Sequence, residues 1–122
     1  MTVQWDNKKP TVQMLGRWQP WHDGHLALFK RAHAKTGQVA VMVRDVSGTT
    51  DNPFDFVEVK NRVIKQLTLA GYNYQQDFMV LLVPNITNIT YGRTVGYTIE
   101  QETFDEETHA ISATKIRKDM GL

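Results

Sequence analysis

Three short apolar runs alternate with two stretches of helical periodicity over the first two thirds of the chain. The runs are residues 11–15, 38–43 and 78–83. The second and third are nearly continuous in apolar residues, which is typical of strands buried on both faces. The first ends at Gly16 and the third at Pro84. The pattern predicts three strands separated by two crossover segments.

Each crossover segment carries residues at a helical spacing of i, i+3, i+4 and i+7. In residues 24–35 the shared face consists of His25, Leu28, Phe29 and Ala32. In the second segment it consists of Phe56, Val59, Val63, Leu67 and Ala70. Gly37 and Gly71 follow the two stretches, as glycines do after a helix. We expect the second helix to begin with Asn52 as N-cap and Pro53 at N1.

The last third of the chain is predicted to add one strand and one short helix. Residues 96–103 alternate as a strand does, and Ser112 is a candidate N-cap for a helix that runs to Met120. The resulting order of strands and helices predicts an α/β fold with a parallel sheet. We expect a single Rossmann-like domain over residues 11–122 behind a polar leader, residues 1–10. Ligands of such sheets bind beyond the carboxyl ends of the strands.

Composition narrows the functional classes. The chain has 122 residues, enough for one domain, and its net charge of +1 does not favour a nucleic acid partner. Without cysteine there is no thiol nucleophile and no disulfide. The first residues lack the apolar core of a signal peptide, and no apolar run could span a bilayer. We therefore expect a cytoplasmic protein that binds a small anion rather than a membrane.

The stretch from Gly16 to His25 carries the first candidate site. His22 and His25 lie three residues apart where a helix should begin, and free N–H groups at a helix N-terminus favour a phosphate. Arg17 adds a forked cation, and Gly24 lets the backbone approach a ligand. The pair could alternatively bind a metal or cap the helix. The tryptophans between, Trp18 and Trp21, could be core or lid residues or could stack on a base.

A second candidate anion site lies in residues 111–117. Ser112 and Thr114 offer hydroxyl groups at a predicted helix start, and Arg117 shares a helix face with Thr114. Considered alone, this pattern also fits a solvated, basic first turn.

Residues after the predicted strands are candidates for binding a second substrate. Arg44 follows the second strand and Asn85 the third, while Arg93 is the last basic residue before an acidic stretch. Each could instead be an exposed loop residue. The remaining histidines, His33 and His109, have no partner pattern and are expected at the surface.

Both candidate sites resemble the motifs of one known family. Gly16-Arg-Trp-Gln-Pro-Trp-His-Asp-Gly-His25 resembles the Gly-Arg-Phe-x-Pro-x-His-x-Gly-His motif of the nucleotidylyltransferase superfamily. Ile111-Ser-Ala-Thr-Lys-Ile-Arg117 resembles its C-terminal Ile-Ser-Ser/Thr-Thr-x-Ile-Arg motif. The resemblance extends from Val12 to Met120. It implies transfer of a nucleoside monophosphate from a nucleoside triphosphate to a small, phosphorylated acceptor, with Mg²⁺ bound alongside the nucleotide and no covalent intermediate.

The resemblance also implies roles for individual residues. His22 and His25 would hold the triphosphate and stabilise charge on the reacting phosphate, while Arg117 would act on its β- and γ-phosphates. The catalytic candidates are His22, His25 and Arg117. The nucleotide-binding candidates are Gly16, Arg17, Trp18, Gly24, Ser112 and Thr114. The candidates for the acceptor are Trp21, Arg44, Asn85 and Arg93, and no side chain is assigned to a metal.

A finer resemblance favours ATP over CTP as the donor. Residues 51–54, Asp-Asn-Pro-Phe, resemble the Asn-Pro-Phe of archaeal-type nicotinamide mononucleotide adenylyltransferases. The compact stretch between Val83 and Ile111 is closer in length to cytidylyltransferases, and Ala113 departs from the family motif. A cytidylyltransferase, a non-catalytic nucleotide-binding module and a domain of a larger assembly remain alternatives. Related small members suggest a homodimer.

Overall fold

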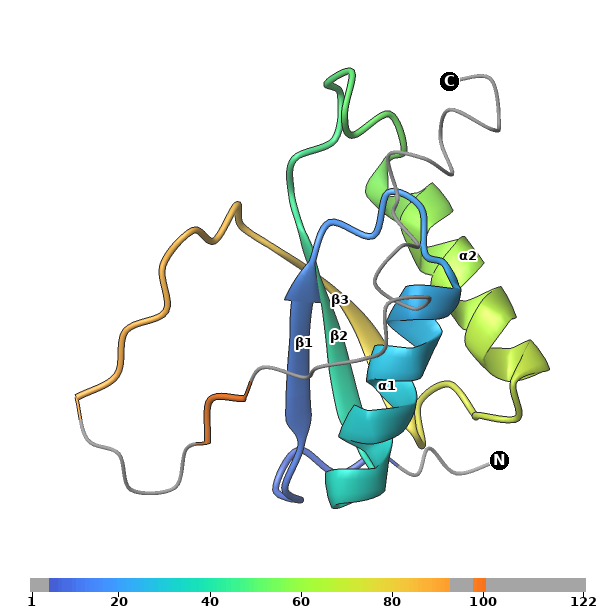
Figure 1. Ribbon diagram of the computed structural model, residues 1–122, viewed down its shortest axis with the longest axis vertical. Helices are drawn as coiled ribbons and strands as arrows, with labels where there is room; N and C mark the ends of the chain where they lie inside the picture. The colour runs from blue at the N-terminus through green and yellow to red at the C-terminus, as the bar shows by residue number, and fades with distance from the viewer. Residues whose placement is uncertain (1–4, 93–97, 101–122) are drawn as a thin grey trace.

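A computed structural model describes residues 5–92 and 98–100 of the chain. Their elements are β1 (Val12–Gly16), α1 (Asp23–Thr36), β2 (Val39–Arg44), α2 (Phe56–Leu69) and β3 (Phe78–Val83). The strands form a parallel sheet in the order β1-β2-β3, as Figure 1 shows. The predicted α/β class, the first three strands and both crossover helices are confirmed.

Both helices lie on the same face of this sheet (Figure 1). Such an arrangement follows from the strand order, because right-handed crossovers that step in one direction place successive helices on one side. Side chains on that face of β2 are fully buried, whereas the alternate ones are half-buried. The expectation that β2 is buried on both faces is therefore wrong for the described residues, since the helices cover one face.

The core between helices and sheet is built around Phe29 of α1, which has no exposed surface. Its ring meets Tyr72 and Phe78 edge to face, with centroid separations of 4.8 and 5.9 Å. From α2, Val63 and Leu67 are also fully buried, as the helical spacing predicted. The last member of the expected stripe, Ala70, is exposed because α2 has already ended at Leu69.

Helix α2 begins three residues later than the sequence indicated. Its N-cap is Asp55, whose carboxylate accepts a hydrogen bond from the Glu58 N–H at 2.9 Å. The predicted cap, Asn52, instead donates its side-chain amide to the Thr49 hydroxyl within a turn. Asp55 serves as well as asparagine in a cap, and its use allows Phe54 to be buried before the helix starts.

Glycines end both helices as expected. The N–H of Gly37 donates to the His33 carbonyl at 2.7 Å, and its φ of 77° lies in the left-handed region. Gly71 has a φ of 100°. Such angles are strained for residues with a Cβ, so glycine is the residue suited to both positions.

The remaining predicted elements lie outside most of what the structure describes. Of the strand expected over residues 96–103, only 98–100 are described, and these are not in a strand. The helix expected from Ser112 to Met120 is outside the described residues. Neither helix in the described part of the chain combines the length and hydropathy that a bilayer crossing needs.

Candidate functional site

The loop that follows β1 starts at the carboxyl end of the sheet, and Trp18 fixes its position there. This residue has a φ of 52°, an uncommon left-handed value for a residue with a side chain. Its indole N–H donates to the Met42 carbonyl of β2 at 3.1 Å. A Cβ on Gly16 would lie only 2.7 Å from the Trp18 ring. Gly16 is thus required by the packing of this ring.

His22 and His25 form a reciprocal cap at the start of α1. The Nδ1 atom of His22 accepts hydrogen bonds from the backbone N–H groups of Gly24 and His25, at 3.1 and 3.4 Å. The Nδ1 atom of His25 accepts from the His22 N–H at 3.1 Å. An accepting Nδ1 carries no proton, so in each neutral ring the hydrogen is on Nε2.

In this geometry the cap is compatible with the anion-binding role that the sequence left as an alternative. Each ring uses Nδ1 to cap the helix and retains Nε2–H as a donor on its far side. The two rings are stacked, with centroids 3.6 Å apart and an interplanar angle of 16°. The helix N-terminus beside them adds its partial positive charge. The pair therefore presents two hydrogen-bond donors to an anion without requiring a charged imidazole.

Burial keeps this pair neutral. Removal from solvent lowers the pKa of His25 to about 3, with a smaller lowering from the neighbouring charge of His22. Burial also lowers the pKa of His22, although the nearby carboxylate of Asp23 acts in the opposite direction. At neutral pH both imidazoles are uncharged and retain the Nε2–H tautomer.

The two tryptophans pack around His25 and are buried, each with 6% of its surface exposed. Trp18 meets the His25 ring edge to face at 4.7 Å, and Trp21 lies 5.4 Å from it in a tilted arrangement. The indoles are themselves 5.2 Å apart. Of the two readings, a core role is the one that this packing supports. The indole N–H of Trp21 is buried and has no hydrogen-bond partner among the described residues.

Two of the candidate acceptor-binding residues, Arg44 and Asn85, meet at the carboxyl end of the sheet. The guanidinium of Arg44, at the end of β2, donates to the Asn85 side-chain carbonyl at 2.8 Å. The pairing of the two strands extends one residue beyond β2, because the Asp45 N–H donates to the carbonyl of Val83, the last residue of β3, at 2.9 Å. This additional hydrogen bond keeps the end of β2 beside the end of β3, so that Arg44 and Asn85 meet.

The other candidates are only partly described. Arg17 is exposed in the loop, and the Gly24 N–H is engaged by His22. The following predicted residues lie outside the described part of the chain: Arg93, His109, Ser112, Thr114 and Arg117. His33 is not simply a surface residue as expected, since its Nε2 lies 2.9 Å from a carboxylate oxygen of Asp77.

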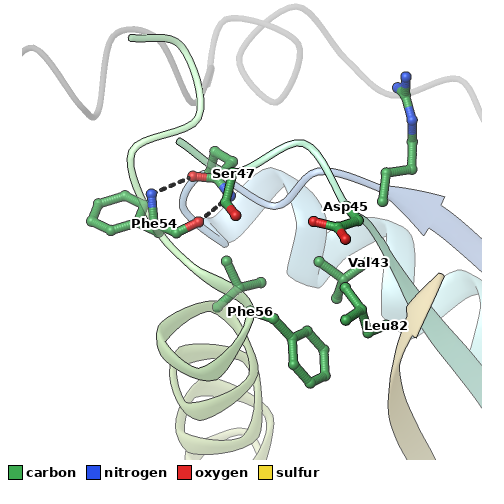
Figure 2. Close-up of a pocket in the computed structure, with 9 residues that line it drawn as sticks. Val43, Asp45, Ser47, Phe54, Phe56 and Leu82 are labelled. Carbon is green, nitrogen blue, oxygen red and sulfur yellow. Dashed lines mark hydrogen bonds between the residues drawn. The ribbon is translucent and has the colours of Figure 1, made fainter. Parts of the chain in front are cut away.

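A small pocket beside the site contains a residue that sequence reasoning gave no role, Gln19. Figure 2 shows Phe54 and Phe56 on one side of this pocket, opposite Val43 and Leu82 of the sheet. Gln19 is only 3% exposed and bonds twice to the backbone of Phe54. The one available signal was a glutamine within the motif, which does not reveal a distant partner.

Within the described residues, the histidine pair is not joined by further metal-ligating side chains. Within residues 5–92 and 98–100, no three histidine or carboxylate side chains lie together in a way that could hold a cation. Mg²⁺ is commonly bound by substrate phosphates and water together with one or two carboxylates. A nucleotide-borne Mg²⁺ is compatible with this site, whereas the histidine pair has no described third ligand.

Several known proteins have sequences similar to this chain. The chain is 28% and 29% identical to nicotinamide-nucleotide adenylyltransferases from two strains of Methanococcus maripaludis. Each match covers 88% of this chain and 75% of the relative. A Methanococcus aeolicus protein of the same name is 25% identical, covering 84% of this chain and 66% of its own length. No family model matches the chain.

One solved structure has a fold similar to that of this chain. It is a bifunctional NMN adenylyltransferase/ADP-ribose pyrophosphatase from Francisella tularensis, in complex with AMP and a manganese ion. The TM-score is 0.53 at 27% identity, and the match covers 62% of this chain but 22% of that one. The chain is therefore similar in sequence and in fold to nucleotidylyltransferases. More narrowly, it is a distant homologue of archaeal nicotinamide-nucleotide adenylyltransferases.

Proposed function

We propose that this protein transfers the adenylyl group of ATP to nicotinamide mononucleotide and releases pyrophosphate. The observation that carries the proposal is the reciprocal histidine cap, which leaves two Nε2–H donors at the N-terminus of α1. The names of the archaeal relatives support the choice of ATP and of this acceptor. Because these relatives are 28% and 29% identical to the chain, both substrates are to be tested directly.

In the proposed reaction an acceptor phosphate oxygen attacks the α-phosphorus of ATP. The bond from that phosphorus to the oxygen bridging toward the β-phosphate breaks, and pyrophosphate departs with the electron pair. Negative charge increases on the transferring and leaving phosphates. His22 and His25 would donate Nε2–H bonds to these oxygens, and the helix dipole would add to the stabilisation. Because no side chain becomes covalently bound, acceleration comes from alignment and electrostatics.

The remaining phosphates would be held by residues of the second motif. We assign Ser112, Thr114 and Arg117 to the β- and γ-phosphates and Arg17 to a further phosphate contact, all by their positions in the family motifs. The cation that accompanies the nucleotide supplies charge neutralisation when bound. These contacts would hold the triphosphate from two sides.

The hydrogen-bonded pair at the sheet edge is the proposed acceptor contact. Arg44 already donates to Asn85, so its guanidinium is oriented before any ligand arrives. Its remaining N–H groups would bind the acceptor phosphate, for which a planar guanidinium is well suited. Preorganisation of this kind reduces the entropy that binding must overcome.

The test is pyrophosphate release with Mg²⁺, one of ATP, CTP, GTP or UTP, and a panel of acceptors that includes nicotinamide mononucleotide. We expect turnover that is fastest with ATP and this acceptor. His25→Asn should lower kcat by about a hundredfold, the scale on which loss of a transition-state donor acts. His33→Asn is the matched control on the same helix and should retain turnover.

Three results would argue against the proposal. Pyrophosphate release from none of the triphosphates with any acceptor would refute catalysis, and ATP binding in calorimetry would then identify a nucleotide-binding module. A preference for CTP would replace the adenylyl assignment with a cytidylyl one. Equal turnover by His25→Asn and the unaltered protein would remove the histidine pair from the reaction.

A further inference from the structure

Gln19 joins two loops that are far apart in the sequence. Its side-chain oxygen accepts a hydrogen bond from the Phe54 N–H at 2.9 Å, and its side-chain nitrogen donates to the Phe54 carbonyl at 3.0 Å. Figure 2 marks both bonds beside the pocket. The two residues are 35 positions apart, and both bonds are buried. One amide therefore satisfies both backbone groups of a single residue.

Phe54 is also held from the side of α2. Its ring is buried, with 6% exposed, and the Arg62 guanidinium lies over it at 4.6 Å from the centroid. Arg62 in turn contacts Glu58 one turn earlier at 3.3 Å. Such a cation–π contact stabilises the ring most when it is partly desolvated. Phe54 is thus fixed on its backbone by Gln19 and on its ring by Arg62.

The joined residues lie within a few positions of the starts of two helices. Gln19 lies three positions before His22, the N-cap of α1, and Phe54 precedes Asp55, the N-cap of α2. The connection therefore sets the spacing between the histidine cap and the segment 45–54 that follows β2. In the proposed reaction, phosphates bound at the histidine cap must align with an acceptor bound at Arg44, which directly precedes this segment.

We propose that Gln19 is a positioning residue that holds the histidine cap in register with the segment 45–54. This inference rests on the proposed adenylyl transfer for its catalytic consequence, though not for its structural one. Gln19 contacts no reacting atom in this scheme and acts through the backbone of Phe54. Because a displacement of about 1 Å can lower a rate about a hundredfold, a small shift between the loops is sufficient to reduce turnover.

The variant that isolates this role is Gln19→Met, which keeps the length of the side chain and removes both bonds. We expect kcat to fall by about tenfold to a hundredfold, while the KM for ATP stays within about threefold, because the triphosphate contacts remain. Gln13→Met, on the exposed side of β1, is the matched control and should leave both constants unchanged. Gln19→Glu keeps the acceptor for the Phe54 N–H and serves if the first variant does not fold.

A double-mutant comparison tests whether Gln19 acts through Phe54. Arg62→Gln releases the ring of Phe54 and should lower kcat by itself. In the Gln19→Met background the same change should have a much smaller effect, since the backbone connection is already lost. Fully multiplicative effects would overturn the proposed route through Phe54.

Amide hydrogen exchange gives a readout that does not depend on turnover. In Gln19→Met, exchange should accelerate at Phe54 and also at His22 and His25, whose N–H groups form the reciprocal cap. Faster exchange at Phe54 with unchanged exchange at both histidines would overturn the proposal. If the unaltered protein shows no turnover, the function fails, and the exchange result alone decides whether Gln19 positions the cap.

Discussion

The buried neutral state of His25 makes a specific prediction about stability and pH. The pKa of this residue is lowered from 6.5 to about 3 in the folded protein. Between these values the unfolded chain binds a proton that the folded chain excludes, so the free energy of unfolding falls as the pH is lowered through this window. Above pH 6.5 neither the folded nor the unfolded chain protonates this residue, so the free energy of unfolding is not reduced there. At about pH 5 it has decreased by about 2 kcal/mol, since each pH unit below the unfolded pKa costs about 1.4 kcal/mol.

The perturbation that exposes this contribution is His25→Asn. Asparagine has a side-chain oxygen that can replace Nδ1 as acceptor from the His22 N–H, but it does not titrate. Urea unfolding of both proteins at about pH 7.5 and about pH 5 gives four free energies. The unaltered protein should lose about 2 kcal/mol more than the variant on acidification. Equal losses in the two proteins would refute the assignment of a buried, neutral His25.

Three further substitutions test separate parts of the structure. Asp55→Ala should lower the free energy of unfolding by about 1 kcal/mol in urea titrations, and no loss would contradict Asp55 as the cap of α2. Trp18→Phe keeps an aromatic ring but leaves the Met42 carbonyl without its indole donor, so about 1 kcal/mol should be lost in the same assay; unchanged stability would show that the bond contributes nothing. Arg117→Gln should lower kcat/KM by about a hundredfold in pyrophosphate release, and full activity would exclude Arg117 from the site.

Local patterns in the sequence were sufficient for most of the described fold. Apolar runs and helical spacing depend on neighbours within a few residues, and they gave both helices and all three strands of the described sheet. The start of α2 was misjudged because Asn52 and Asp55 are both good caps. Burial of Phe54 against Gln19 and Arg62 favours the later one, and a local pattern does not contain that packing.

The site was only partly predictable for the same reason. The spacing of His22 and His25 identified a helix N-terminus that could receive an anion. It could not show that each ring caps the helix with one nitrogen, because this depends on ring orientations in the folded chain. The partners of Gln19 and Arg44 are separated from them by 35 and 41 positions. Contacts at such distances leave no periodic trace in a single sequence.

The fit between Gly16 and the Trp18 ring has a consequence for engineering the loop. Removing the indole with Trp18→Ala would leave a largely enclosed, apolar space that has the shape of that ring and the Met42 carbonyl at one point. Apolar cavities of this kind in proteins stay dry and bind small aromatic molecules. Free indole could fill the space and donate to the same carbonyl. The loop that carries the histidine cap would then become ordered when indole binds, and the ordered fraction would depend on the indole concentration.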